Sequence, residues 1–218
     1  MNGTKHGQQQ HRDSRQRQKT PAVGRATVSA AGVLRARDLE RQHGLSRTQI
    51  RRLSARGELV QHARGIYAAP DAPVTEHHTL VEVALRVPRA VICLTSALRF
   101  HDLTTQSPWR VHILLPVGAW TPRLDMVELV VFRTGQPEAL VDGVETHLLE
   151  GVPVRVTSVA RTVADCFKWR GRLGLDIALE ALKECLREKR ATPEEIRRFA
   201  AMNRVEKVMR PYMEAVLA

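Results

Sequence analysis

Cysteine is scarce in this chain, and long apolar runs are absent. The only three cysteines, Cys93, Cys166 and Cys185, lie far apart and form no CxxC pair. An odd, scattered set argues against a disulfide scaffold, so we expect buried, reduced thiols. No apolar run is long enough to cross a membrane, and the polar first 20 residues contain no apolar signal segment. These shortages predict a cytoplasmic protein with no membrane partner.

Acidic residues are also scarce, but only in the N-terminal third. Residues 1–70 contain 14 Arg or Lys against 4 Asp or Glu, and residues 71–218 contain 20 against 19. Nearly all of the net charge of +11 therefore belongs to the first third. If the positive charge came only from a generally arginine-rich composition, the excess of basic residues would extend along the whole chain. The asymmetry favours a polyanionic partner whose binding weakens as salt rises.

Residues 33–68 have the order of a winged helix-turn-helix. Good helix formers fill residues 35–42, and Gly44 follows, which favours a helix end because glycine accepts left-handed backbone. Ser46 is then a candidate N-cap for a second helix over residues 47–56.

That second helix has a narrow apolar edge and a broad basic face. Ile50 and Leu53 are three residues apart and turn inward together, and Gly57 ends the helix. Two short apolar runs follow, at residues 58–60 and 66–68, separated by a basic tip that contains glycine. The order predicts a recognition helix followed by a two-stranded wing.

The residue types on this surface suit duplex DNA. A recognition helix presents its first turn to base edges in the major groove, so Thr48 and Gln49 are candidate base contacts. Arginines further along the helix are placed to contact phosphates. The candidate DNA-binding residues are Arg37, Arg47, Thr48, Gln49, Arg51, Arg52, Arg56, His62 and Arg64. The alternative interpretation is a solvated basic helix in an ordinary helical hairpin.

Composition predicts an α+β fold in three segments. We expect a disordered basic arm over residues 1–22. A winged helix-turn-helix domain is expected over residues 23–70, with its first helix at 23–31. A mixed α/β domain with a small sheet and a helical C-terminal portion is expected over residues 71–218. In the third segment we expect helices at 75–87, 96–101, 158–170, 173–190 and from Pro193, and strands at 91–94, 110–115, 126–132, 143–150 and 152–156. Pro211 is expected to kink or break the last helix.

Four short motifs follow one another along residues 30–170. They are Arg64-Gly65-Ile66-Tyr67, the segment LTSALRFHDL from Leu94, the strand VHILLP from Val111, and the segment TSVARTVADC from Thr157. In this order they resemble the AbiEi family, the antitoxin and transcriptional-regulator half of AbiE-type toxin–antitoxin systems. Asp102 stands where the family usually has glycine, and Val159-Ala160 where it usually has Pro-Glu.

The resemblance implies a function for each of the two domains. The winged domain would bind inverted repeats in its own promoter and repress transcription. The C-terminal domain would neutralise a nucleotidyltransferase toxin encoded beside it, in phage defence. Members are described as type IV antitoxins, which act without a stable toxin complex, so direct toxin contact stays open, as does dimeric or cooperative assembly on DNA.

In the fourth motif we expect a structural role for Ser158, Arg161, Thr162 and Asp165. Arg161 and Asp165 are four residues apart on a helix, which allows either a surface ion pair or a buried pair that anchors the helix to the sheet.

Catalytic and metal sites are not predicted. His77 and His78 are adjacent on a helix and point about 100° apart, which suits no single ion. Ser96 lacks a G-x-S-x-G setting and is expected to cap a helix, while His101 is expected to be a packed structural residue. Trp109 and Trp120 are expected to pack in the core or at a sheet edge; the alternative for Trp120, beside Gly118, is an exposed contact residue.

No cofactor is expected, and the chain is not expected to be an enzyme. Two alternatives remain. One is a plain winged-helix repressor whose C-terminal domain senses a ligand or dimerises, and the other is a nuclease-like or nucleotidyltransferase-like enzyme.

Overall fold

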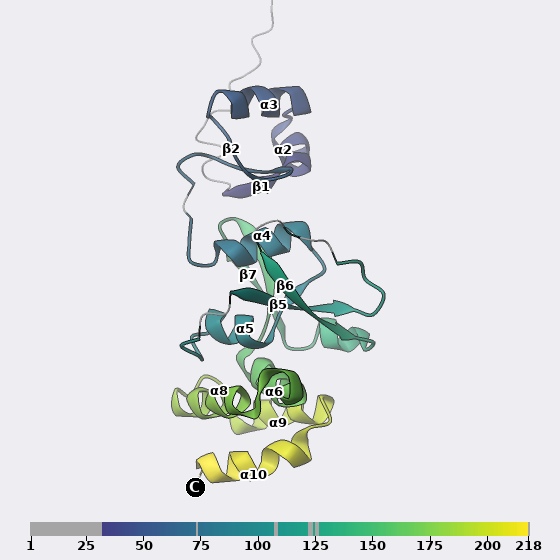
Figure 1. Ribbon diagram of the computed structural model, residues 1–218, viewed down its shortest axis with the longest axis vertical. Helices are drawn as coiled ribbons and strands as arrows, with labels where there is room; N and C mark the ends of the chain where they lie inside the picture. Colours follow the sequence, from purple (N-terminus) through teal and green to yellow (C-terminus); the bar gives the residue numbers. More distant parts are fainter. Residues whose placement is uncertain (1–31, 73, 107–108, 122–123, 125–126, 218) are drawn as a thin grey trace, which may run out of the picture.

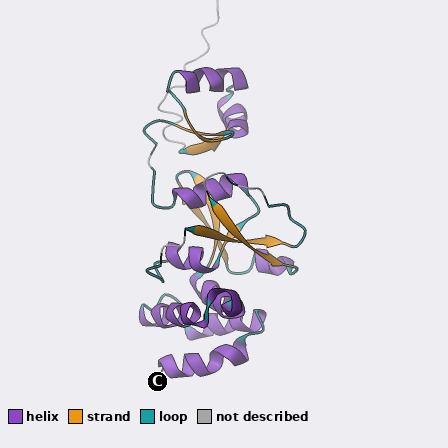
Figure 2. Cartoon of the chain, viewed as in Figure 1, coloured by secondary structure: helices purple, strands orange, loops and turns teal. Residues whose placement is uncertain are grey.

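The computed structural model describes residues 32–217 except 73, 107–108, 122–123 and 125–126. The expected arm and the expected helix at 23–31 lie outside the described residues. The fold is α+β, as predicted, with a winged region (residues 32–70) at one end and an α/β region (residues 74–217) that finishes in a stack of helices (Figures 1 and 2). Within the described residues, no helix is long and apolar enough to cross a membrane.

The winged region contains two helices and a three-stranded antiparallel sheet of order β1-β3-β2. Its elements are β1 (Val33–Arg35), α2 (Ala36–His43), α3 (Arg47–Ala55), β2 (Val60–Ala63) and β3 (Ile66–Ala68). The two helices are as predicted, and Gly44 has the expected left-handed φ of 65°. A hairpin is present, but its first strand is Val60–Ala63 and not residues 58–60 as expected, so the basic tip shortens to Arg64 and Gly65. The strand β1 was not predicted; it pairs with β3 and adds a third strand to the hairpin.

The α/β region is built on a five-stranded mixed sheet of order β6-β5-β4-β8-β7. The strands are β4 (Val91–Ile92), β5 (Arg110–Pro116), β6 (Glu128–Thr134), β7 (Val144–Leu149) and β8 (Val152–Thr157). The helices are α4 (His78–Arg86), α5 (Leu94–Phe100), the short 3-10 helix η1 (Pro137–Leu140), α6 (Val159–Lys168), α7 (Arg170–Leu173), α8 (Leu175–Arg187), α9 (Pro193–Met202) and α10 (Glu206–Leu217).

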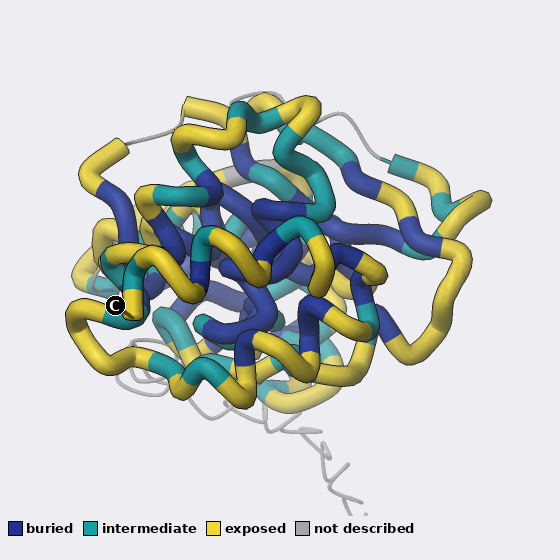
Figure 3. The backbone as a smooth tube through the Cα atoms, turned by 90° about the horizontal axis from the view of Figure 1, so that it is seen from below, coloured by how far each residue is buried: buried dark blue, intermediate teal, exposed yellow. Residues whose placement is uncertain are grey.

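The two faces of the sheet belong to two different hydrophobic clusters. Along β5, Leu114 packs with α5, α6 and the C-terminal helices, while Ile113 and Leu115 pack under α4. This alternation follows from the two-residue period of a strand. Seen from the C-terminal end, the buried segments lie at the centre of the molecule and the exposed turns surround them (Figure 3).

The winged region has a small core of its own and also shares one. Leu39 and Ile50 pack together in a separate cluster. Val33, Ile66 and Ala68, however, belong to the cluster that lies under α4. The winged sheet therefore packs on the α/β region and is not a freely tethered unit in this structure.

Glu150 joins the two regions. Its backbone oxygen accepts a hydrogen bond from the Val33 N–H at 3.1 Å, and its carboxylate accepts from the backbone and hydroxyl of Thr75 and from His78 Nδ1 at 2.8–2.9 Å. Glu150 and Gly151 form the turn between β7 and β8 with φ of 49° and 78°, the left-handed pair that a tight hairpin requires. A hairpin tip of the α/β region thus fixes the start of the winged sheet.

Several local predictions were wrong. The expected strand at 91–94 ends at Ile92, because Leu94 has a φ of 52° and begins α5. Ser96 consequently lies inside α5, where its hydroxyl accepts from the His112 N–H at 2.9 Å and caps nothing. The helix α10 continues through Pro211, so of the two expected effects, a kink or a break, the break is absent.

The tryptophans at 109 and 120 are the clearest correction, because their side chains are 69% and 80% exposed. The guanidinium carbon of Arg110 lies 4.1 Å from the centroid of the Trp109 ring. Asp102 takes a φ of 56°, a left-handed conformation that glycine adopts freely and aspartate tolerates.

Candidate nucleic-acid interface

The recognition helix α3 begins at a capping box. The Gln49 N–H donates to Ser46 Oγ at 3.3 Å, and Gln49 Oε1 accepts from the Ser46 N–H and hydroxyl at 2.8 Å. Ser46 is therefore the N-cap, as predicted. The S-x-x-Q pattern that signals the box was overlooked, and it gives Gln49 a second role. Bidentate pairing with adenine needs the amide oxygen that the box now uses, so such pairing would require the box to open.

The outer face of α3 is basic and exposed. Ile50 is 2% exposed and holds the helix on the winged core, while Thr48, Arg51 and Arg52 turn outward. Within the described residues, neither Arg51 nor Arg52 forms an ion pair. Two adjacent guanidinium groups are thus free to contact an external anion.

Three further candidate arginines have acidic neighbours. Arg47 lies 3.1 Å from Glu40, Arg37 lies 3.8 Å from Asp38, and Arg56 lies 3.9 Å from Glu58. The arginine side chains are 68–86% exposed. Such solvated pairs contribute about 0–1 kcal/mol, so a DNA phosphate can replace the carboxylate at little cost.

The wing tip presents Arg64 beside Gly65. Gly65 has a φ of 76°, and its carbonyl accepts from the Ala36 N–H at 2.9 Å, so the tip lies against the start of α2. The Arg64 side chain is exposed and forms no ion pair within the described residues. The tip therefore presents an unpaired cation next to the helix pair.

His62 lies in a different setting from the arginines. Its ring is 5.1 Å from the ring of His78, the residue that contacts Glu150. Burial lowers the pKa of His62, and the His78 ring adds to this, against the opposing charges of Glu150 and Glu82. His62 therefore lies beside α4 of the α/β region.

The fourth sequence motif forms a buried polar network. Arg161 is 1% exposed; its Nε lies 3.2–3.3 Å from the Asp165 carboxylate, and its terminal nitrogens donate to the carbonyls of Ala139 and Asp142. Asp165 also accepts from Asn203 Nδ2 at 2.7 Å. The pair thus lies in the core and connects α6 to η1 and α9. Burial raises the pKa of Asp165, and the charge of Arg161 and the Asn203 hydrogen bond oppose this.

The start of the same helix is held by hydroxyl groups. Thr162 Oγ1 donates to the Ser158 carbonyl at 2.8 Å and contacts the Thr157 hydroxyl at 2.7 Å. The Ser158 hydroxyl is buried and has no hydrogen-bond partner among the described residues. These contacts hold the first turn of α6 against the end of β8.

No metal-ligating cluster of three or more His, Cys, Asp or Glu occurs in the part of the chain that the structure describes. All three cysteines are buried and free, as predicted, and burial raises the pKa of the Cys185 thiol to about 11. His101 is buried with Nε2 2.7 Å from the Thr157 carbonyl, which confirms it as a packed structural residue.

The sequence of the winged region matches a known protein family. Residues 28–70 match the model of a family described as a transcriptional regulator, AbiEi antitoxin. Over these residues the chain is similar to an AbiEi-family domain. The match agrees with the resemblance seen in the sequence, and it ends where the linker to the α/β region begins. No curated protein matches the chain.

One solved structure resembles the larger part of this chain. It is the crystal structure of the RV2827C protein from Mycobacterium tuberculosis, with a TM-score of 0.53 and 15% sequence identity. The match covers 81% of this chain and 69% of that one. At this identity the likeness concerns the fold, and it extends beyond the winged domain into the α/β region.

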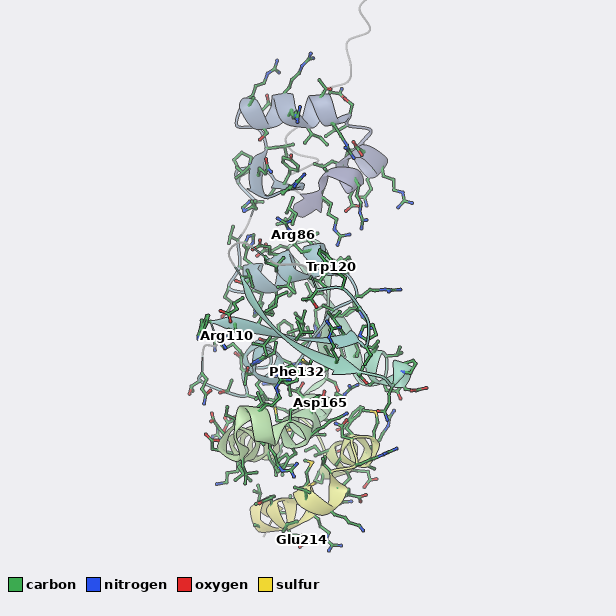
Figure 4. The ribbon with its side chains drawn as sticks, turned by 45° about the vertical axis from the view of Figure 1, so that its right-hand side comes forward. Arg86, Arg110, Trp120, Phe132, Asp165 and Glu214 are labelled. Carbon is green, nitrogen blue, oxygen red and sulfur yellow. The ribbon has the colours of Figure 1, made fainter. Side chains whose placement is uncertain are left out.

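Two arginines at the junction escaped the sequence analysis. Arg35 donates from Nη2 to the Ala84 carbonyl at 3.1 Å, which connects β1 to α4. Arg86, at the end of α4, lies between the winged region and the sheet (Figure 4). No motif marks either residue, because their proximity depends on how the two regions pack.

Proposed function

We propose that this protein is a DNA-binding transcriptional autorepressor and antitoxin of a toxin–antitoxin operon. The winged domain binds inverted repeats in its own promoter, with α3 in the major groove. The α/β region neutralises a nucleotidyltransferase toxin encoded beside it. The proposal includes no catalytic activity. The match of residues 28–70 to a family of AbiEi antitoxins and transcriptional regulators supports both functions.

The observation that carries the DNA-binding half is the basic outer face of α3. Arg51 and Arg52 are exposed and unpaired within the described residues, while Ile50 fixes the helix on its core. A rigid helix with free cations and an adjacent cationic wing tip is the arrangement that winged proteins place against duplex DNA. Promoter DNA, titrated in a gel-shift assay, tests this half directly.

The antitoxin half is tested by co-expression with the adjacent nucleotidyltransferase gene, with growth as the readout. Because Val33, Ile66 and Ala68 share a cluster with the α/β region, the division of labour is best tested in the full chain. We expect Arg51→Ala with Arg52→Ala to lose promoter repression and still to protect cells from the toxin. Loss of protection in a folded double variant would assign neutralisation to the DNA-binding surface instead.

A ligand-responsive repressor is the second candidate, because a cavity of about 640 Å³ lies between the two regions. It is lined by β1, α2 and the β7–β8 hairpin, with Arg35, Asp38 and Arg155 among its polar groups. Cavities at such junctions are common small-molecule sites. Promoter release by a metabolite, without any adjacent toxin gene, would favour this candidate.

A further inference from the structure

A second hollow at the junction is lined by arginine from both regions. Its volume is about 410 Å³. The winged region contributes the start of α2, the first residue of α3 and the wing tip, and the α/β region contributes the end of α4. The arginines of this arginine-lined hollow are Arg35, Arg37, Arg47, Arg64 and Arg86.

The positive charge of this hollow is only partly compensated. Arg37 and Arg47 have exposed acidic neighbours, Asp38 and Glu40, but no carboxylate lines the hollow itself among the described residues. Arg64 and Arg86 form no ion pair with any residue that the structure describes. Cations this close to one another repel unless an anion lies between them.

Two guanidinium nitrogens at the hollow also lack partners. The Nε atoms of Arg35 and Arg86 are both buried and have no hydrogen-bond partner in the described part of the chain. Leaving buried donors unsatisfied costs free energy, and native proteins rarely do so without a functional reason. A ligand with several acceptor oxygens would satisfy the donors and the charge together.

We propose that the arginine-lined hollow binds a phosphate group of the DNA backbone, so that α4 of the α/β region is part of the DNA interface. Arginine binds phosphate through paired N–H donors. The hollow has five arginines and, among the described residues, no carboxylate that would repel a phosphate. The proposal rests on the proposed function. It adds Arg86, a contact that the winged domain alone cannot supply.

Duplex DNA is favoured over a free phosphate compound because of what else lines the hollow. Arg47 begins the recognition helix and Arg64 is at the wing tip, the two elements that contact the duplex in the proposed mode. A backbone phosphate bound there would contact the winged region and α4 at once. Since the Ala84 carbonyl already holds Arg35, DNA would reinforce an existing connection between the two regions.

The test compares full-length variants binding a duplex of about 30 base pairs and mixed sequence, which measures the sequence-independent phosphate contacts. Arg86→Ala is the test variant and Arg86→Lys keeps the charge. Arg210→Ala is the matched control, because Arg210 is 75% exposed on α10 at the opposite end of the molecule (Figure 1). Fluorescence anisotropy is recorded across a salt series, and thermal melting confirms that each variant folds.

We expect Arg86→Ala to lose about five- to tenfold in affinity at 0.1 M salt and to lower the log–log salt slope by about 0.9, the effect of one phosphate contact. Arg86→Lys should retain most of the slope, and Arg210→Ala should match the unaltered protein. If Arg86→Ala behaves like Arg210→Ala while Arg51→Ala with Arg52→Ala weakens binding, the proposed function stands and this inference is wrong.

A parallel arm uses inorganic pyrophosphate and thermal melting. If pyrophosphate stabilises the unaltered protein but not Arg86→Ala, and duplex affinity is the same for both, the hollow holds a free phosphate compound and the DNA assignment is overturned. Failure of the unaltered protein to bind any duplex would remove the proposed function itself.

Discussion

Replacing Arg161 by Met should be among the most destabilising single changes in this chain. Arg161 is 1% exposed and pairs with Asp165 in the core, and its two terminal nitrogens satisfy the carbonyls of Ala139 and Asp142. Methionine preserves much of the volume, so the cost reports the polar contacts and not a cavity.

The expected loss of folding stability follows from the buried charge and the carbonyl groups that lose their partners. Removing one partner of a buried ion pair costs about 3–5 kcal/mol, because the other charge stays buried and unpaired. Two carbonyls lose their donors at about 1 kcal/mol each, with incomplete additivity. We therefore expect a loss of about 4–6 kcal/mol, a large part of the ~5–15 kcal/mol that keeps a typical domain folded.

Adding Asp165→Asn to the Met variant should recover part of this loss. The double variant buries no charge, and the asparagine oxygen can still accept from Asn203. We expect the double variant to be about 1–3 kcal/mol more stable than Arg161→Met alone, the sign of a coupled pair.

Urea unfolding followed by tryptophan fluorescence measures these differences in the right part of the molecule. Trp169 packs on Phe132 with ring centroids 4.9 Å apart, whereas Trp109 and Trp120 are already exposed. The signal therefore reports chiefly on the core around Phe132, which Figure 4 labels near Asp165. A cost below about 1 kcal/mol for Arg161→Met, or no recovery in the double variant, would refute the structural role of the motif.

Two further predictions concern the histidines and the junction. Burial lowers the pKa of His112 to about 4, and the charges of Arg172 and Arg110 add to this, while burial also lowers the pKa of His101. A histidine whose pKa is lower in the folded state than in the unfolded state contributes stability that is present above about pH 6.5 and is lost as pH falls. In urea titrations we therefore expect the protein to be about 1–2 kcal/mol less stable at pH 5 than at pH 7.5. The stability of His112→Gln should depend less on pH. A stability that rises on acidification would contradict this. Gly32→Ala places a Cβ 1.9 Å from the Glu150 carbonyl oxygen at a φ of +69°. The substitution should destabilise the junction by at least about 1–2 kcal/mol and make proteolysis there faster. Gly57→Ala is the control for backbone strain alone, because Gly57 has a φ of +71° and open space around its Cβ position. Equal effects of the two glycine changes would show that the contact with Glu150 is unimportant.

The winged region was largely readable from the sequence because its signals are local. Gly44, Ser46 and Ile50 specify the turn, the cap and the buried face of α3 within seven residues. β1 was missed because three residues carry no periodicity of their own, and Val33–Arg35 becomes a strand only by pairing with β3 more than thirty residues later.

The junction could not be read in the same way. Arg35 and Arg86 line the same hollow only because β1 packs against α4, and Glu150 reaches Val33 and Thr75 from a distant hairpin. The exposure of Trp109 and Trp120 was not predicted, because large aromatic side chains are usually buried. Only the folded structure shows that these two are exceptions.

The central claim, that the basic face of α3 contacts DNA phosphates, is tested most directly by the salt dependence of duplex binding for the unaltered protein and for Arg51→Ala with Arg52→Ala. Removing two phosphate contacts should lower the log–log slope by about 1.8 and weaken binding roughly 30- to 60-fold at 0.1 M salt. An unchanged slope and affinity in the folded double variant would show that this face does not contact the duplex.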